Sequence, residues 1–160
     1  MNTKTTSTDA LKMLFGYNYA VLKKNLEGLT HEESLLQPEG GGNCLNWVLG
    51  HIVATRNQAL ELLHQEPIWR VEETDVYRRG SLPIRDGSQA QPLDKISADL
   101  ERSQDRLVVG LTKVTAQEMN APVGDQSVGE KLFVLQFHEA YHAGQTGLLR
   151  RMAGHEGAIK

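Results

Sequence analysis

Two histidines near the end of the chain have the spacing of a metal-binding pair. His138 and His142 are four residues apart in the stretch HEAYHAGQ. Residues four apart in an α-helix project from the same face, so the two imidazoles can bind one ion. Two imidazoles alone bind a metal weakly, and the pair by itself is equally compatible with an ordinary helix face. A metal site therefore requires a further ligand from elsewhere in the chain.

The letters His138-Glu139-x-x-His142 also occur in zinc metalloproteases. Such a protease needs a third ligand downstream, and only 18 residues follow His142. The longer form of the motif has glycine and histidine at the positions that Gln145 and Leu148 occupy here. A protease is therefore disfavoured. Glu139 is interpreted as a solvated residue or a helix contact, although its carboxylate could also approach a water on the ion.

His51 is the candidate third ligand. It lies in the middle of a predicted helix, on the face that is expected to point inward. Helical bundles build metal sites from side chains on facing helices, and three histidines leave coordination positions open, as at a catalytic ion. The alternative is a histidine hydrogen-bonded in the core. The remaining histidines lie near predicted helix ends or in loops and are expected to be solvated: His31, His64 and His155.

Four polar residues are candidates for the surroundings of the ion. Gln145, one turn after the histidine pair, can hydrogen-bond a ligand imidazole and fix its tautomer, or it can simply pack between helices. Thr55 and Gln58 follow His51 by four and seven residues, so they either make the pocket wall polar or lie at a surface edge. Asn18 shares the apolar stripe of the first predicted helix, where an amide packs or joins a polar site. No catalytic residue is assigned.

Four long amphipathic helices are expected to position these residues, because apolar side chains recur at three-to-four spacing. The predicted helices cover residues 9–28, 43–65, 92–113 and 127–153. Asn43 is the predicted N-cap of the second helix. A Ser or Thr followed three residues later by Glu predicts a capping box at Thr30, Thr115 and Ser127. Gly154 is expected to end the last helix.

The stretch 66–91 has no sustained periodicity and contains several Pro and Gly residues. We interpret it as a functional crossover between the second and third long helices, in which Trp69 and Tyr77 could cover a pocket. The pattern predicts an all-α fold, a four-helix bundle with a long crossover. At 160 residues, the chain is expected to form one domain over residues 1–160.

Composition narrows the range of functions. The chain has 17 basic and 20 acidic residues, for a net charge of −3, and no dense basic stripe, so nucleic acid is an unexpected partner. Cys44 is the single cysteine, which excludes an intrachain disulfide and fits a cytoplasmic location; it lies too far before His51 to bind the same ion. No apolar run approaches the length of a membrane span.

Two segments, 46–63 and 137–154, make the chain resemble the DinB-like superfamily, a group of small helical bundle proteins unrelated to the DNA polymerase that shares the label. The shared pattern is a histidine in the second helix and HxxxHxGQ in the last helix. The resemblance extends over essentially the whole chain. It includes a stretch of the crossover with Tyr77, Gly80, Ser81 and Pro83. It implies a divalent ion, often nickel or zinc, held by His51, His138 and His142, and it implies a homodimer.

The resemblance also implies a function, because characterised members include metal-dependent transferases of low-molecular-weight thiols. The favoured hypothesis is a metal-dependent enzyme that activates a small thiol for S-transfer to a small-molecule substrate. An open divalent ion turns a thiol into a thiolate, or a water into a hydroxide, at neutral pH. Two alternatives stay open: a hydrolase that uses metal-bound hydroxide, and a non-catalytic stress-response or binding module that the metal stabilises.

Overall fold

The computed structural model describes residues 6–85 and 87–159 of the chain. The four long helices are α1 (Ser7–Leu26), α3 (Leu45–Leu62), α5 (Leu93–Lys113) and α7 (Val128–Met152). The short helices are α2 (His31–Ser34), α4 (Val71–Thr74), η1 (Asp75–Tyr77), η2 (Gly87–Gln89) and α6 (Ala116–Met119). Two antiparallel strands of two residues, β1 (Pro122–Val123) and β2 (Gln126–Ser127), were not expected. The predominantly helical character predicted from the sequence is confirmed.

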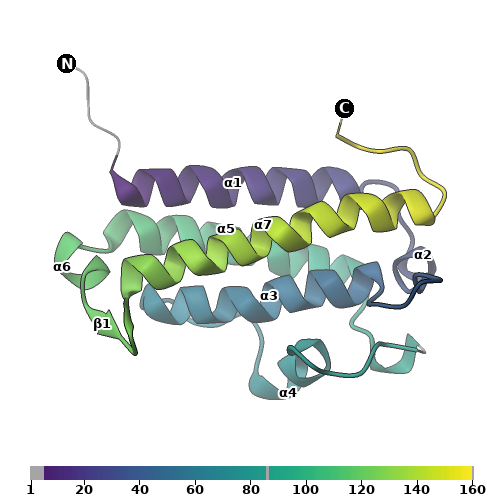
Figure 1. The fold of residues 1–160 in the computed structure, drawn as a ribbon, viewed down its shortest axis with the longest axis horizontal. Helices are drawn as coiled ribbons and strands as arrows, with labels where there is room; N and C mark the ends of the chain where they lie inside the picture. Colours follow the sequence, from purple (N-terminus) through teal and green to yellow (C-terminus); the bar gives the residue numbers. More distant parts are fainter. Residues whose placement is uncertain (1–5, 86, 160) are drawn as a thin grey trace.

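Each long helix packs against two others. α1 contacts α5 and α7, and α3 contacts the same two helices from the other side. The crossover between α3 and α5, which carries α4 and both η helices, lies beside α3 (Figure 1). Within the two described ranges, no helix has the length and apolarity that a membrane crossing requires.

Helix starts follow the side chains that can satisfy free backbone amides. Capping boxes at Thr30, Thr115 and Ser127 are confirmed. A further box at Thr6 starts α1 two residues earlier than the periodicity suggested. The prediction for Asn43 is wrong: Cys44 occupies the N-cap position of α3 and makes no side-chain capping bond, because its side chain is fully buried in the core.

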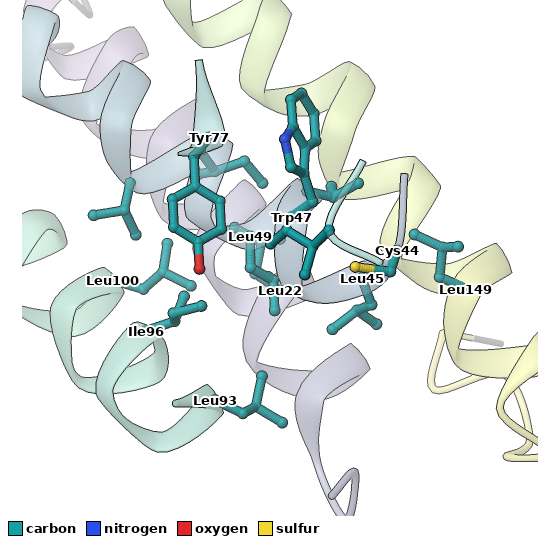
Figure 2. Packing of buried hydrophobic residues seen from close by; sticks show 14 of the residues in the cluster. Leu22, Cys44, Leu45, Trp47, Leu49, Tyr77, Leu93, Ile96, Leu100 and Leu149 are labelled. Carbon is teal, nitrogen blue, oxygen red and sulfur yellow. The ribbon is translucent and has the colours of Figure 1, made fainter. Parts of the chain in front are cut away.

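Tyr77 carries the crossover into the core around α3. Its ring is fully buried among apolar side chains of α3 and α5, including Leu49 and Ile96 (Figure 2). The ring lies against the backbone of Gly50, where an added Cβ would come within 2.2 Å of a ring carbon. Gly50 is therefore required by packing, since any side chain there would displace the tyrosine.

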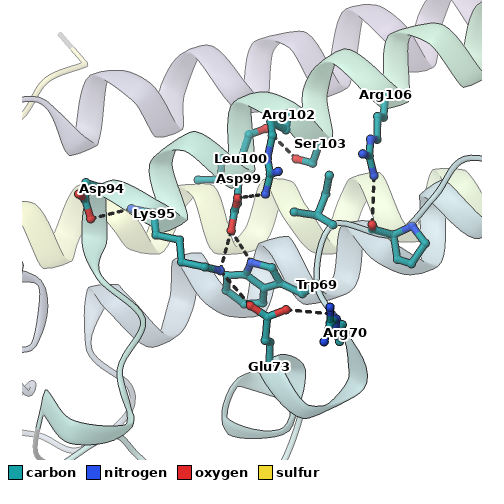
Figure 3. A network of polar contacts seen from close by, with 12 residues as sticks. Trp69, Arg70, Glu73, Asp94, Lys95, Asp99, Leu100, Arg102, Ser103 and Arg106 are labelled. Carbon is teal, nitrogen blue, oxygen red and sulfur yellow. Dashed lines mark hydrogen bonds and ion pairs between the residues drawn. The ribbon is translucent and has the colours of Figure 1, made fainter.

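A second contact anchors the crossover to α5. The indole nitrogen of Trp69 donates to the carboxylate of Asp99 at 2.5 Å, and Lys95 joins that carboxylate to Glu73 with 3.0 Å contacts to both (Figure 3). Arg102 also donates to Asp99. The carboxylate, 2% exposed, thus receives three donors and holds the start of the crossover against the bundle.

Candidate metal centre

Three histidines from two helices converge at one point. His51 projects from α3, and His138 and His142 project from successive turns of α7. The Nε2 atom of His138 lies 3.2 Å from Nε2 of His51 and 3.1 Å from Nε2 of His142. Nitrogens bound to one ion at about 2.0–2.1 Å with tetrahedral angles are roughly 3.3 Å apart, so this spacing fits a shared ion. The His51, His138 and His142 group predicted from the sequence is brought together.

In His51 and His142, a hydrogen bond at Nδ1 fixes the protonation state of Nε2. Nδ1 of His51 lies 2.6 Å from the backbone oxygen of Tyr77, and Nδ1 of His142 lies 2.7 Å from the side-chain oxygen of Gln145. Both oxygens accept, so each Nδ1 carries the hydrogen and each Nε2 presents a lone pair to the centre. These lone pairs face one another around Nε2 of His138, an arrangement that a cation would stabilise.

Burial keeps the imidazoles neutral. It lowers the pKa of His51 to about 4, with a smaller opposing effect from the bond to the Tyr77 carbonyl. Burial also lowers the pKa of His138 and His142, and the nearby Arg79 charge adds to the effect at His138. At neutral pH the three side chains are therefore in the form that binds metals. Nδ1 of His138 is buried and has no hydrogen-bond partner within the described part of the chain.

Aromatic contacts hold the rings in place. Trp47, one turn before His51, stacks on the His51 ring with 4.7 Å between centroids. The Trp47 indole nitrogen in turn donates to the Val76 oxygen at 3.0 Å and the Ser81 hydroxyl at 2.9 Å, so the crossover is bonded to the same face of α3. Sequence reasoning missed this role of residues 76–81, because the Val76 oxygen is a backbone atom and Ser81 stood out only through the family resemblance.

Glu139 has a different role from a protease glutamate. Its carboxylate accepts two hydrogen bonds from Arg56, at 2.7 and 2.8 Å, and both side chains are almost fully buried. The guanidinium also donates to Ser103 and Gln104 of α5. The expected helix contact is therefore a buried ion pair, and the alternative of a solvated glutamate is wrong. Because both of its carboxylate oxygens accept from Arg56, Glu139 is not free to act as a general base.

Two cavities border the histidines. The larger, about 800 Å³, is lined by all three of them together with Trp47, Tyr141, Gln145 and the apolar Leu148 and Met152. The second, about 570 Å³, shares His51 and His138 with the first and extends along α3 toward the crossover. A small molecule in either cavity can therefore reach Nε2 atoms of the histidine group.

The four polar candidates separate into two groups. Gln145 bonds His142 and lines the larger cavity, while Thr55 and Gln58 line the second one. Asn18 lies elsewhere: its amide donates to the Gln136 oxygen at 3.4 Å, between α1 and α7, and it lines neither cavity. The structure thus assigns Asn18 to helix packing and corrects the prediction that it belongs to the pocket.

The other histidines lie outside the group. His64 is exposed, whereas His155 is partly buried and its Nε2 lies 3.0 Å from the Glu33 carboxylate. His31 is also partly buried, so the expectation of solvation holds only in part for these two.

Comparison with known proteins identifies the family. A search of curated proteins finds no match to this chain. A family model described as the DinB superfamily matches residues 15–146, a range that includes α3 with His51 and the part of α7 that carries His138 and His142. Because the match covers most of the 160 residues, the chain belongs to the DinB superfamily.

Proposed function

We propose that this protein is a metal-dependent enzyme that activates a small thiol for transfer to an electrophilic substrate. The observation that supports the proposal is the convergence of three neutral imidazoles on the wall of an 800 Å³ cavity. A divalent ion bound there, nickel or zinc in our proposal, would lower the pKa of a donor in an open coordination position. His51, His138 and His142 would hold the ion.

The lining of the larger cavity favours a thiol over water. A free thiol has a pKa of about 8.5, whereas bulk water has a pKa of about 15.7, so a thiol needs far less help to ionise. No Asp or Glu is among the described residues that line this cavity, and Glu139 is occupied by Arg56. A hydrolase that used the larger cavity would therefore lack a carboxylate in its lining to take up the proton of a water.

The residues around the histidines would orient them and shape the site. The Tyr77 carbonyl and Gln145 hold two imidazoles in the ligand tautomer. Tyr141 lies edge-on to His142 at 5.2 Å between centroids and, with Leu148, gives the cavity an apolar wall for the body of a substrate. The ring of packed long helices supports the classification as a four-helix bundle with a long crossover. The single cysteine is compatible with a cytoplasmic location.

A turnover assay tests this function. The metal-loaded protein is mixed with several small thiols and 1-chloro-2,4-dinitrobenzene, and the thioether product is followed by absorbance. We expect acceleration that disappears in His138→Ala and in the metal-free protein but persists in His64→Asn, which changes an exposed histidine. Hydrolysis of 4-nitrophenyl acetate without thiol would instead support the hydrolase. If neither reaction is accelerated and metal removal only lowers the melting temperature, the ion has a structural role.

An exposed apolar stripe on α7 supports a further proposal, that the protein is a homodimer. The exposed side chains of the stripe are Phe133, Val134, Phe137, Tyr141, Leu148 and Met152. Gly144 lies among them, and an added Cβ there would meet nothing within 4 Å, so a second helix could approach closely. A stripe that runs along one helix can pair with its own copy about a twofold axis.

A further inference from the structure

Two cavities of different character meet at the histidine centre. His51, His138 and Arg79 line both of them. Apart from Arg79 and the histidines, the larger cavity has no charged side chain among its lining residues. The second cavity is strongly cationic for a chain whose net charge is −3. Its cationic side chains are Arg70, Arg78, Arg79 and Lys131, and its carboxylate is that of Glu61.

At least two of these cations, Arg79 and Lys131, have no internal partner. Within the described residues, neither Arg79 nor Lys131 forms an ion pair or a side-chain hydrogen bond. Arg78, by contrast, lies 3.8 Å from Asp75. A guanidinium and an ammonium that line the same cavity without a carboxylate partner are free to bind an anionic ligand, and the planar guanidinium matches carboxylate and phosphate oxygens.

The backbone that carries Arg79 is held in place on both sides. Before it, the Val76 and Tyr77 oxygens accept from Trp47 and His51, and after it the Ser81 hydroxyl accepts from Trp47. The start of the same crossover is bonded to α5 through Glu73, Lys95 and Asp99 (Figure 3). The backbone around Arg79 therefore does not have to become ordered when a ligand binds, which limits the entropic cost.

We propose that the second cavity binds the anionic group of the substrate, a carboxylate or a phosphate, through Arg79 and Lys131. This inference rests on the proposed function, because it takes the histidine centre to be the place where a substrate reacts. An anionic reactant held there reaches His51 and His138 from the crossover side. The larger cavity, with Leu148 and Met152 in its wall, is then free for an uncharged reactant.

Calorimetric titration of the metal-loaded protein tests the inference. The probes are succinate and phenyl phosphate, each compared with a neutral counterpart, succinamide or phenol. The variants are Arg79→Gln and Lys131→Gln, with Arg85→Gln as the control, since Arg85 lies in the same crossover but lines neither cavity. We expect at least one anion to bind roughly fivefold more tightly than its counterpart, the size of one partly exposed charged hydrogen bond. Both test variants should lose this preference, and the control should keep it.

The result that would overturn the inference is an anion preference that is absent from the wild type or unchanged in both test variants. An unchanged preference would mean that the anion binds the ion itself. Metal content and melting temperature of each variant show whether the centre is intact. Because these probes contain no sulfur, the titration is independent of the thiol assay. If the thiol reaction fails but the anion preference depends on Arg79, only the proposed reaction is rejected. If the thiol reaction succeeds but no such preference is found, only the anion site is rejected.

Discussion

At the scale of single residues, Gly50 shows how the absence of a side chain sets the geometry of a ligand. The Tyr77 ring occupies the space where a Cβ would lie, and the carbonyl of the same tyrosine accepts from Nδ1 of His51. Tyr77 therefore couples the residue type at position 50 to the orientation of the His51 ring. The glycine directly before His51 therefore has a steric explanation.

Gly50→Ala should destabilise the protein and weaken metal binding together. An added methyl group would displace the tyrosine, at a cost of about 1–3 kcal/mol for overpacking a filled core. Loss of the bond to His51 should lower metal affinity by about 10–100-fold, as for other outer partners of ligand histidines. Urea denaturation and competition with a chelator measure the two effects.

The control for that substitution is Gly16→Ala in α1, where an added Cβ meets no atom within 4 Å. It should stabilise the helix by about 0.5–1 kcal/mol and leave metal affinity unchanged. Equal metal affinity in Gly50→Ala and the wild type would contradict the role assigned to Tyr77.

The three histidines and the contact from Gln145 could be predicted from the sequence, whereas the contact from Tyr77 could not. The spacing of His138 and His142 predicts that they share one helix face, and His51 lies on a predicted inward face. The Tyr77 carbonyl is a backbone atom, and its partner is 26 residues away in the chain, so side-chain periodicity carries no information about it. Asn18 was ambiguous for a related reason: a buried amide looks the same in sequence whether it packs or lines a pocket.

At the scale of helices, the Arg56–Glu139 ion pair joins three of the four long ones. It connects α3 to α7, and further bonds from the guanidinium reach the Leu100 oxygen and Ser103 on α5. Since Glu139 follows His138 directly, the pair also fixes the rotation of α7 that aims the imidazole at His51.

Arg56→Met should cost about 3–5 kcal/mol of unfolding free energy, because it leaves the Glu139 carboxylate buried and unpaired. Arg56→Met combined with Glu139→Leu should recover much of the lost unfolding free energy, since no unpaired charge is then buried. Urea denaturation at saturating metal measures both. A loss below about 1 kcal/mol in the single variant would mean that water reaches the carboxylate.

Asp99 ties the crossover to α5 and should give stability a dependence on acid. Burial raises the pKa of Asp99, but bonds from Trp69, Lys95 and Arg102 outweigh it, and the net pKa is lowered below 3.8. A carboxylate with a lowered folded-state pKa contributes stability above its unfolded pKa and loses it as pH falls through the folded value. Asp99→Asn should therefore cost about 1–3 kcal/mol at pH 7, with the difference narrowing below about pH 4.

Asp105→Asn, an exposed aspartate of the same helix, is the control and should change stability little. A wild-type advantage over Asp99→Asn that stays constant from pH 7 to pH 3 would show that the carboxylate charge is not what anchors Trp69.

Elements with local signals were predicted well, and elements that depend on tertiary contacts were not. The capping boxes at Thr30, Thr115 and Ser127 are local and were found. The start of α3 was misplaced because Asn43 is a good capping residue, yet the burial of Cys44 decides where the helix begins. The short helices of the crossover have too few turns to produce a periodic pattern.

At the scale of the whole molecule, the exposed stripe on α7 should determine association. Phe137 of this stripe is 73% exposed, and Leu82 is 86% exposed in the crossover, outside the stripe. Phe137→Lys should shift sedimentation equilibrium from dimer toward monomer, because a charge buried at the interface is costly. Leu82→Lys should leave the dimer intact. A monomeric wild type at micromolar concentration, or identical behaviour of both variants, would contradict the dimer.

The central claim is that imidazoles from α3 and α7 hold one divalent ion, and elemental analysis of the purified protein tests it most directly. Wild type and His64→Asn should each contain close to one equivalent of a divalent transition metal after dialysis against a weak chelator. His51→Ala and His138→Ala should each retain a small fraction of an equivalent while keeping a helical circular dichroism spectrum, because two imidazoles bind weakly. A full equivalent of metal in folded His51→Ala would contradict the account.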